Sequence, residues 1–198
     1  MELKDGKKTF YAKTRIEWRK WLTKNGQKEK SVWLIIYHKK ASTSSVYYDE
    51  AVEEALCFGW IDSKPNKRDD SSYYLFFSQR KPKSNWSDIN KKRVAILLEN
   101  GLITQAGMDV IQQAKENGAW NALDEVSEMK LPEDLINALR NYKKARQYFQ
   151  AFPASVKKGI LEWIHNAKGE ETRKKRIEET AKLAARNIRA NQYQRKPK

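Results

Sequence analysis

The sequence predicts an α+β protein: a small mixed or antiparallel sheet with helices in the N-terminal half, followed by an all-helical C-terminal half. Short apolar runs rich in β-branched and aromatic residues, which are typical of strands, occur only before residue 80. Apolar residues at helical spacing occur along the whole chain. The 198 residues are 39% hydrophobic and include seven Trp, which suffices for a sizeable core without disulfides and argues against wholesale disorder.

The first helix is predicted to begin after Thr14, because Thr14 and Glu17 form a capping box. Gly26 is expected to end this helix in a left-handed conformation. The apolar stripe of the helix comprises Ile16, Trp18, Trp21 and Leu22. The continuous apolar run within residues 31–38 predicts a strand that is buried on both faces, and residues 39–45 form a polar loop.

Helical spacing returns over residues 48–59, and Gly59 is expected to end this second helix. Four carboxylates crowd its first turns, where the helix dipole favours negative charge, and we expect a solvated face there. These residues are Asp49, Glu50, Glu53 and Glu54. Two further strands are predicted at 60–62 and 73–78, on either side of a polar turn.

The strand signals stop near residue 80, and helices are predicted over the rest of the chain. Ser84 or Ser87 can cap a helix that runs to Glu99, with Trp86, Ile89, Ile96 and Leu97 as candidate core contacts. Further helices are expected at 104–117, from Pro132 onward, at 143–151, at 155–167 and at 170–188. We expect domain boundaries that separate residues 1–82, 83–189 and a disordered basic tail at 190–198; one core shared by the first two regions is the alternative.

Charge and composition restrict the class of protein. The net charge is +15, and the basic excess lies at the two ends of the chain around a neutral middle. This excess favours attraction to nucleic acid, anionic lipid or an acidic protein. No apolar run is long enough to span a bilayer, the N-terminus lacks the apolar core of a secretion signal, and the single Cys57 cannot form an internal disulfide. These features predict a cytoplasmic protein.

Three motifs, in order along the chain, carry a resemblance to a known family. The first is residues 53–62 (EEALCFGWID), and the second is residues 80–87 (RKPKSNWS) followed by Asn90 and Arg93. The third comprises Trp163-Ile164, Ala167-Lys168, Glu171-Thr172-Arg173 and Arg176-Ile177. With these motifs the chain resembles the YdeI/OmpD-associated, or bacteriocin-protection, family over about residues 10–188.

The resemblance implies an association with tolerance to bacteriocins or cationic antimicrobial peptides, and with an outer-membrane porin. It implies no particular reaction, cofactor or catalytic residue.

The junction between the sheet and the following helices is the first candidate site. If the strands at 60–62 and 73–78 pair, their ends face a common groove. Cationic side chains and helix N–H groups would bind an anion there, and indoles would stack on a ring of the ligand. The ligand-binding candidates are Trp60, Asp62, Arg80, Lys81, Lys83, Ser84, Asn85 and Trp86. The alternative interpretation is that Trp86 is core, Ser84 is a plain cap and the lysines are solvated.

The last helix is the second candidate site. Lys175, Lys182, Arg186 and Arg189 form a basic ridge on the side opposite an apolar stripe of Ile177, Ala181, Ala184 and Ile188. Such a ridge can contact phosphates or anionic headgroups. A solvated outer face is the alternative, and no zinc-finger, aromatic RNA-binding or recognition-helix motif accompanies the ridge.

Catalytic and metal sites are weakly supported by the sequence. Cys57, His38 and Asp62 would make a nucleophilic set, but Cys57 lies beside several carboxylates, which disfavour a thiolate. The two histidines are far apart and no metal-binding spacing is present. We therefore assign no catalytic residue, no metal and no cofactor.

We expect a non-enzymatic binding protein for an anionic small molecule, linked to bacteriocin or antimicrobial-peptide tolerance by the resemblance alone. One alternative is a polyanion-binding module for DNA or RNA, whose affinity would fall steeply with salt. The other is an enzyme of unknown reaction with its pocket near Trp60 and Asp62. The sequence leaves the oligomeric state open.

Overall fold

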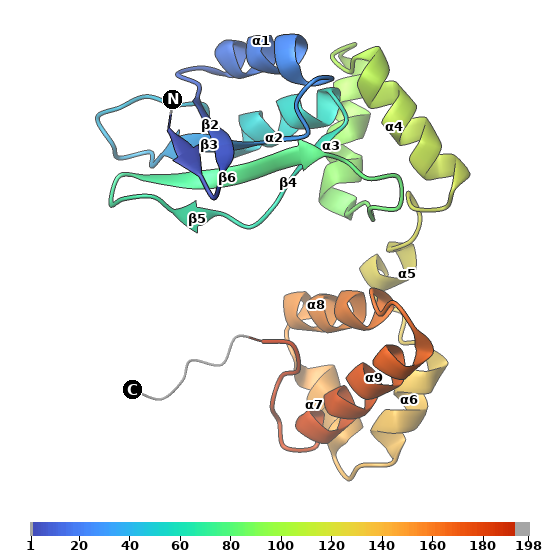
Figure 1. The fold of residues 1–198 in the computed structure, drawn as a ribbon. Coiled ribbons are helices and arrows are strands. Elements are labelled where there is room, and N and C mark those ends of the chain that lie inside the picture. Colours follow the sequence, from blue (N-terminus) through green and yellow to red (C-terminus); the bar gives the residue numbers. More distant parts are fainter. Residues whose placement is uncertain (1, 193–198) are drawn as a thin grey trace. The chain divides into compact units, whose positions relative to one another are not determined.

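The computed structural model describes residues 2–192 and divides the chain into two compact units, Met1–Asn121 and Ala122–Lys198. We call them the sheet unit and the helical unit (Figure 1). This division differs from the boundary expected at 82/83. The helices that follow residue 83 bury Val94, Leu97, Ile111 and Ala114 in the same core as the sheet, so they belong to the first unit.

A mixed six-stranded sheet forms the centre of the sheet unit. Its strands are β1 (Leu3–Lys4), β2 (Lys7–Tyr11), β3 (Ser31–Tyr37), β4 (Trp60–Asp62), β5 (Asn66–Lys67) and β6 (Ser72–Gln79). The strand order is β1-β2-β3-β6-β4, and β5 pairs with β6 beside this path. The pairing of β2 with β3 is parallel, and the other pairings are antiparallel. The expected small mixed sheet is confirmed.

Four helices accompany the sheet: α1 (Arg15–Asn25), α2 (Tyr48–Cys57), α3 (Asp88–Glu99) and α4 (Gln105–Glu116). Helices α1 and α2 lie over one face of the sheet, and α3 and α4 lie beside α2 (Figure 1). Residues of β3 and β6 alternate between two faces, so Leu34 and Phe77 point into the core under the helices. Trp18 and Trp60 are buried in the same core.

The opposite face of the sheet carries a smaller hydrophobic cluster of Trp33, Ile35 and Tyr74, two of which are aromatic. The Lys4 ammonium lies 5.9 Å from the centroid of the Trp33 ring and 5.7 Å from that of Tyr74. The Arg68 guanidinium also lies over Tyr74, at 5.9 Å. Cationic side chains from β1 and the β5–β6 turn therefore cover this aromatic surface.

Two strands at the N-terminus were not predicted from the sequence. Asp5 and Gly6 both have positive φ, which makes the two-residue turn of the β1–β2 hairpin. Strand β2 gives little apolar signal in the sequence. Its residues Lys7, Lys8 and Tyr11 are exposed, and its buried residue is the polar Thr9. Helix α1 was expected correctly, with Thr14 as its cap, but Gly26 is right-handed rather than left-handed.

Several expected core contacts are wrong. Ile16 of α1 and Ile89 and Ile96 of α3 are exposed, whereas Trp86 and Leu97 are buried as expected. Helix α3 turns a different face inward, with Val94 as its buried residue near the middle. Since apolar residues lie all around α3, helical periodicity alone did not select the buried face.

The helical unit contains α5 (Asp124–Ser127), α6 (Glu133–Arg140), α7 (Ala145–Ala151), α8 (Ala154–His165) and α9 (Glu170–Ala184). Helix α9 packs against α6, α7 and α8, and its Ile177 and Ala181 are buried among them. In the described part of the chain, no helix has the length and apolar character needed to cross a bilayer.

The last helix ends earlier than expected, at Ala184 rather than residue 188. Asn187 adopts a left-handed conformation, and the N–H of Ile188 donates to the Leu183 carbonyl, which closes the helix. Ile188 is consequently exposed and does not extend the apolar stripe. Of the tail expected to be disordered, Ala190 is buried, while residues 193–198 lie outside the described part of the chain.

Candidate functional site

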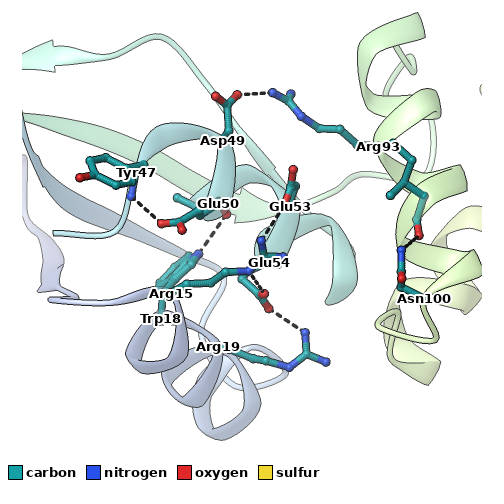
Figure 2. A network of polar contacts seen from close by, with 12 residues as sticks. Arg15, Trp18, Arg19, Tyr47, Asp49, Glu50, Glu53, Glu54, Arg93 and Asn100 are labelled. Carbon is teal, nitrogen blue, oxygen red and sulfur yellow. Dashed lines mark hydrogen bonds and ion pairs between the residues drawn. The ribbon is translucent and has the colours of Figure 1, made fainter. Parts of the chain in front are cut away.

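The carboxylates at the start of α2 belong to an ion-pair network that joins three helices (Figure 2). Arg15 of α1 donates to Glu53 at 2.8 Å and to Glu54 at 2.6 Å, and Arg19 donates to Glu54 at 2.7 Å. Glu54 is only 3% exposed. The expected solvated face is therefore wrong for Glu54, which the guanidinium groups of α1 neutralise inside the unit.

The other two carboxylates of α2 also have protein partners. Glu50 accepts a hydrogen bond from the backbone N–H of Tyr47 at 3.0 Å and so caps the helix. Asp49 accepts a hydrogen bond from Arg93 of α3. Asp49 thus ties α2 to α3, whereas Glu50 stabilises the first turn of α2 itself.

The two indoles proposed to stack on a ligand are both buried, at 1% exposure. Trp60 donates from Nε1 to the Gly26 carbonyl at 3.1 Å and packs edge-on against Trp21. Trp86 packs against Trp120 with ring centroids 4.9 Å apart. Neither ring is available at the surface for stacking on a ligand.

Arg80 is the buried cation of the predicted site. Its guanidinium carbon lies 3.7 Å from the centroid of the Trp86 ring, and Nη1 donates to the Asn85 carbonyl at 2.8 Å. Nε and Nη2 are buried and have no hydrogen-bond partner. Burial lowers the pKa of Arg80 to about 10, against the opposing attraction of Asp62.

Asp62 is engaged by a tyrosine rather than by a cation. The Tyr48 hydroxyl donates to Asp62 Oδ2 at 2.9 Å. Partial burial, with the nearby Asp62 carboxylate, raises the pKa of Tyr48 to about 12. Tyr48 therefore remains a hydrogen-bond donor over the physiological range.

The remaining predicted residues lie on the loop between β6 and α3. Lys81 and Lys83 are exposed, and Ser84 and Asn85 are half-buried. Ser87, not Ser84, caps α3 by accepting the N–H of Asn90 at 3.3 Å. The structure therefore brings Arg80, Asn85 and Trp86 into contact but leaves Lys81 and Lys83 in solvent.

A pocket whose lining the sequence did not predict lies beside Tyr48, the hydrogen-bond partner of Asp62. It has a volume of about 520 Å³, and its aromatic walls are His38, Tyr48 and Tyr73. His38 and Tyr73 have ring centroids 5.5 Å apart. The polar turn over residues 64–72 supplies the opposite rim, including Asn66 and Asp69. This turn was the sequence feature that could have located the pocket.

The nucleophilic set weighed from the sequence is not assembled. Cys57 is fully buried, and burial raises the pKa of its thiol. Its predicted partners interact elsewhere, because His38 lies against Tyr73 and Asp62 accepts from Tyr48. Among residues 2–192, no group of three or more His, Cys, Asp or Glu side chains is placed to hold a metal ion.

In the helical unit, three of the four predicted basic residues lie together. Lys175, Lys182 and Arg186 line a groove of about 790 Å³, which we call the α9 groove. Arg189 is exposed and does not line it. The other lining residues are Tyr142, Lys174, Glu178, Glu179, Leu183 and Ala185.

The third motif holds the helices of this unit together. Arg173 donates from Nε and Nη2 to the two carboxylate oxygens of Asp134, at 2.7 and 3.0 Å. Arg176 donates to the Trp163 carbonyl and lies over the Trp163 ring at 5.0 Å. These contacts tie α9 to α6 and α8, so they position the α9 groove without lining it.

Two family models match the chain. Residues 10–110 match the model described as Domain of unknown function (DUF8412), and residues 128–187 match the model described as Bacteriocin-protection, YdeI or OmpD-Associated. The resemblance to the second family is thus confirmed for its own stretch, whereas the motifs at 53–62 and 80–93 lie in the first match. No curated protein and no solved structure matched the chain.

Proposed function

The chain belongs to the family described as Domain of unknown function (DUF8412) and carries a second region of the bacteriocin-protection type, and from this premise we propose that it is a binding protein for an anionic amphiphile. The site is the α9 groove, which lies wholly within residues 128–187. The observation that carries the proposal is a pair of uncompensated cations, Lys175 and Arg186, over an apolar floor. The proposal includes a role in tolerance to bacteriocins or antimicrobial peptides and a cytoplasmic location.

The charges of the α9 groove favour an anion. Four cationic side chains line the groove, against the carboxylates of Glu178 and Glu179. Lys182 pairs with Glu178 at 3.2 Å, and Tyr142 donates to the same carboxylate. Within the described residues, Lys175 and Arg186 have no carboxylate at ion-pair distance. A phosphate or carboxylate headgroup would supply the missing counter-charge.

The floor of the groove favours an apolar tail beside that headgroup. Tyr142, Leu183 and Ala185 are half-buried and contribute ring and methyl surface to the lining of the same groove. Burial of an alkyl chain on such a surface contributes about 0.8 kcal/mol per methylene group. An amphiphilic anion therefore uses both features of the groove, whereas inorganic phosphate uses only one.

Calorimetry with three probes tests this assignment. Octyl phosphate combines charge and tail, octyl glucoside provides the tail alone, and inorganic phosphate provides the charge alone. We expect octyl phosphate to bind most tightly. The double variant Lys175→Gln/Arg186→Gln should bind it about tenfold more weakly, since two solvent-exposed ionic contacts of under about 1 kcal/mol each are lost.

The matched control removes two exposed cations of the same unit that do not line the groove. The double variant Arg146→Gln/Lys168→Gln carries the same net charge and should keep the wild-type affinity for octyl phosphate. Equal binding of octyl phosphate by both double variants would refute the proposal. Tight binding of single-stranded DNA with a steep salt dependence, unaffected by Lys175→Gln/Arg186→Gln, would instead favour the polyanion-binding alternative.

A cellular assay tests the link to tolerance. Cells that lack the gene are complemented with the wild type or with either double variant and then exposed to a cationic antimicrobial peptide. We expect Lys175→Gln/Arg186→Gln to fail and the control to restore survival. Full restoration of survival by the wild type and by both double variants would show that the α9 groove has no role in protection.

A further inference from the structure

We propose that the sheet unit holds a small oxyanion, a phosphate or a carboxylate, on the Nε–Nη2 edge of Arg80. This site is separate from the α9 groove, and it lies between the end of β6 and the start of α3. Arg80 is 6% exposed, and its guanidinium is stacked on Trp86. The stacking fixes the plane of the guanidinium, and the bond from Nη1 to Asn85 fixes its rotation within that plane.

Three buried N–H donors of these two side chains have no acceptor. They are Nε and Nη2 of Arg80 and Nε1 of Trp86. Buried donors in native proteins almost always have partners, and a buried unpaired cation is costlier still. Asp62 attracts the charge of Arg80 but has no hydrogen bond to it. An oxyanion on the Nε–Nη2 edge would satisfy both Arg80 donors and compensate the charge together.

The empty edge is the one that other arginines of this chain use for carboxylates. Arg173 binds Asp134 through Nε and Nη2, at 2.7 and 3.0 Å. Arg68 binds Glu2 through the same two atoms, at 3.4 and 3.0 Å. This edge, which we call the fork, presents two parallel N–H groups that match two oxygens of a carboxylate or phosphate. Arg80 presents the same fork with neither oxygen in place.

Access to the fork depends on the loop that connects β6 to α3. Hydrogen bonds along this loop include that of the Ser84 N–H to the Lys81 carbonyl at 2.9 Å, that of the Asn117 side chain to the Pro82 carbonyl at 3.0 Å and that of Arg80 Nη1 to the Asn85 carbonyl at 2.8 Å. Lys81 and Lys83 are exposed on the same loop and raise the local concentration of anions. A local opening of the loop would admit a small ion to the fork.

Thermal unfolding of the full chain, followed by Trp fluorescence, tests the site. Sodium phosphate and sodium acetate are titrated separately, with sodium chloride keeping the ionic strength constant, so that the two arms distinguish phosphate from carboxylate. We expect one of the two anions to raise the melting temperature saturably, by about 5 °C at a hundredfold excess over Kd. The absence of a saturable rise with either anion would overturn the proposal.

Three variants separate the fork from general charge. Arg80→Lys keeps the cation but lacks the fork, and Arg80→Met lacks both; each should lose the anion-dependent rise. Lys81→Gln removes an exposed neighbouring charge and should retain it. An equal rise in all four proteins would overturn the proposal, as would a crystal structure, grown with the stabilising anion, that shows only a water molecule at Nε and Nη2.

Discussion

Glu54 of α2 accepts a hydrogen bond from Arg15 of α1 at 2.6 Å, although its side chain is almost completely shielded from water. Arg19 completes the neutralisation of the same carboxylate at 2.7 Å. The two helices that cover one face of the sheet are therefore joined by a buried charge as well as by apolar packing. Such a carboxylate is tolerated only while its partners remain in place.

Removal of this carboxylate should destabilise the sheet unit. We expect Glu54→Ala to lower the free energy of unfolding by about 2–3 kcal/mol, because two partly buried guanidinium groups lose their acceptor. Urea unfolding followed by Trp fluorescence reports this change, since six of the seven Trp lie in the sheet unit. The exposed Glu99→Ala is the control and should stay within about 0.5 kcal/mol of the wild type. A similar loss in both variants would contradict the assigned role of Glu54.

A side chain at Gly59 should be costlier than one at a comparable glycine. Gly59 and Gly118 both have positive φ, but a Cβ at Gly59 would lie 2.8 Å from a Val110 methyl carbon, whereas nothing lies within 4 Å at Gly118. We expect Gly118→Ala to cost about 1 kcal/mol through backbone strain alone. Gly59→Ala should cost an additional 1–3 kcal/mol, roughly, through overpacking. Urea unfolding of both variants measures the difference. Equal losses of unfolding free energy would show that Val110 of α4 moves away to accommodate the added Cβ.

The stability of the sheet unit should fall at alkaline pH because of Tyr48. The folded state raises the pKa of Tyr48 to about 12, so it holds this proton more tightly than the unfolded chain does. The contribution is complete below about pH 10, the ordinary value for tyrosine, and is lost as the pH rises towards 12. Because the pKa values of Tyr11, Tyr73 and Tyr74 are also raised, Tyr48→Phe should reduce this alkaline step in a plot of urea midpoint against pH, and Tyr47→Phe should leave it unchanged. An undiminished alkaline fall of the urea midpoint in Tyr48→Phe would show that Tyr48 does not contribute to it.

The Asp134–Arg173 pair should contribute to the helical unit only above acidic pH. The Arg173 guanidinium lowers the pKa of Asp134. The contribution is therefore present above about pH 4, the unfolded value, and is lost as the pH falls through the lower folded value. Because both side chains are partly exposed, we expect Arg173→Gln to cost less than about 1 kcal/mol at neutral pH. At acidic pH the variant and the wild type should have the same stability by circular dichroism; a constant difference would rule out this linkage.

The sequence predicted the elements whose signals are local. The capping box at Thr14 and the continuous apolar run of β3 were sufficient for α1 and for a buried strand. Strand β2 lacked such a signal, because its pairing with β3 supplies most of its stabilisation. The Asp5-Gly6 dipeptide, both residues of which are left-handed, was the available signal for the first hairpin.

The candidate sites were predictable only as sets of residue types. The spacing of Lys175, Lys182 and Arg186 placed them on one side of a helix, and the structure adds Tyr142 from another segment as part of the same groove. At the other site the sequence could not distinguish an indole at the surface from one in the core. Burial of Trp60 and Trp86 involves Trp21 of α1 and Trp120, which follows α4, and both partners are distant in sequence. The sequence likewise could not show that Nε and Nη2 of Arg80 have no acceptor.

The complete burial of Cys57 has a practical consequence for spectroscopy. The sequence contains one cysteine, so a thiol introduced on the surface of either unit would react with a maleimide dye far faster than the native one. A site-specific label can therefore be attached at an exposed position, for example through Lys81→Cys, without replacing Cys57.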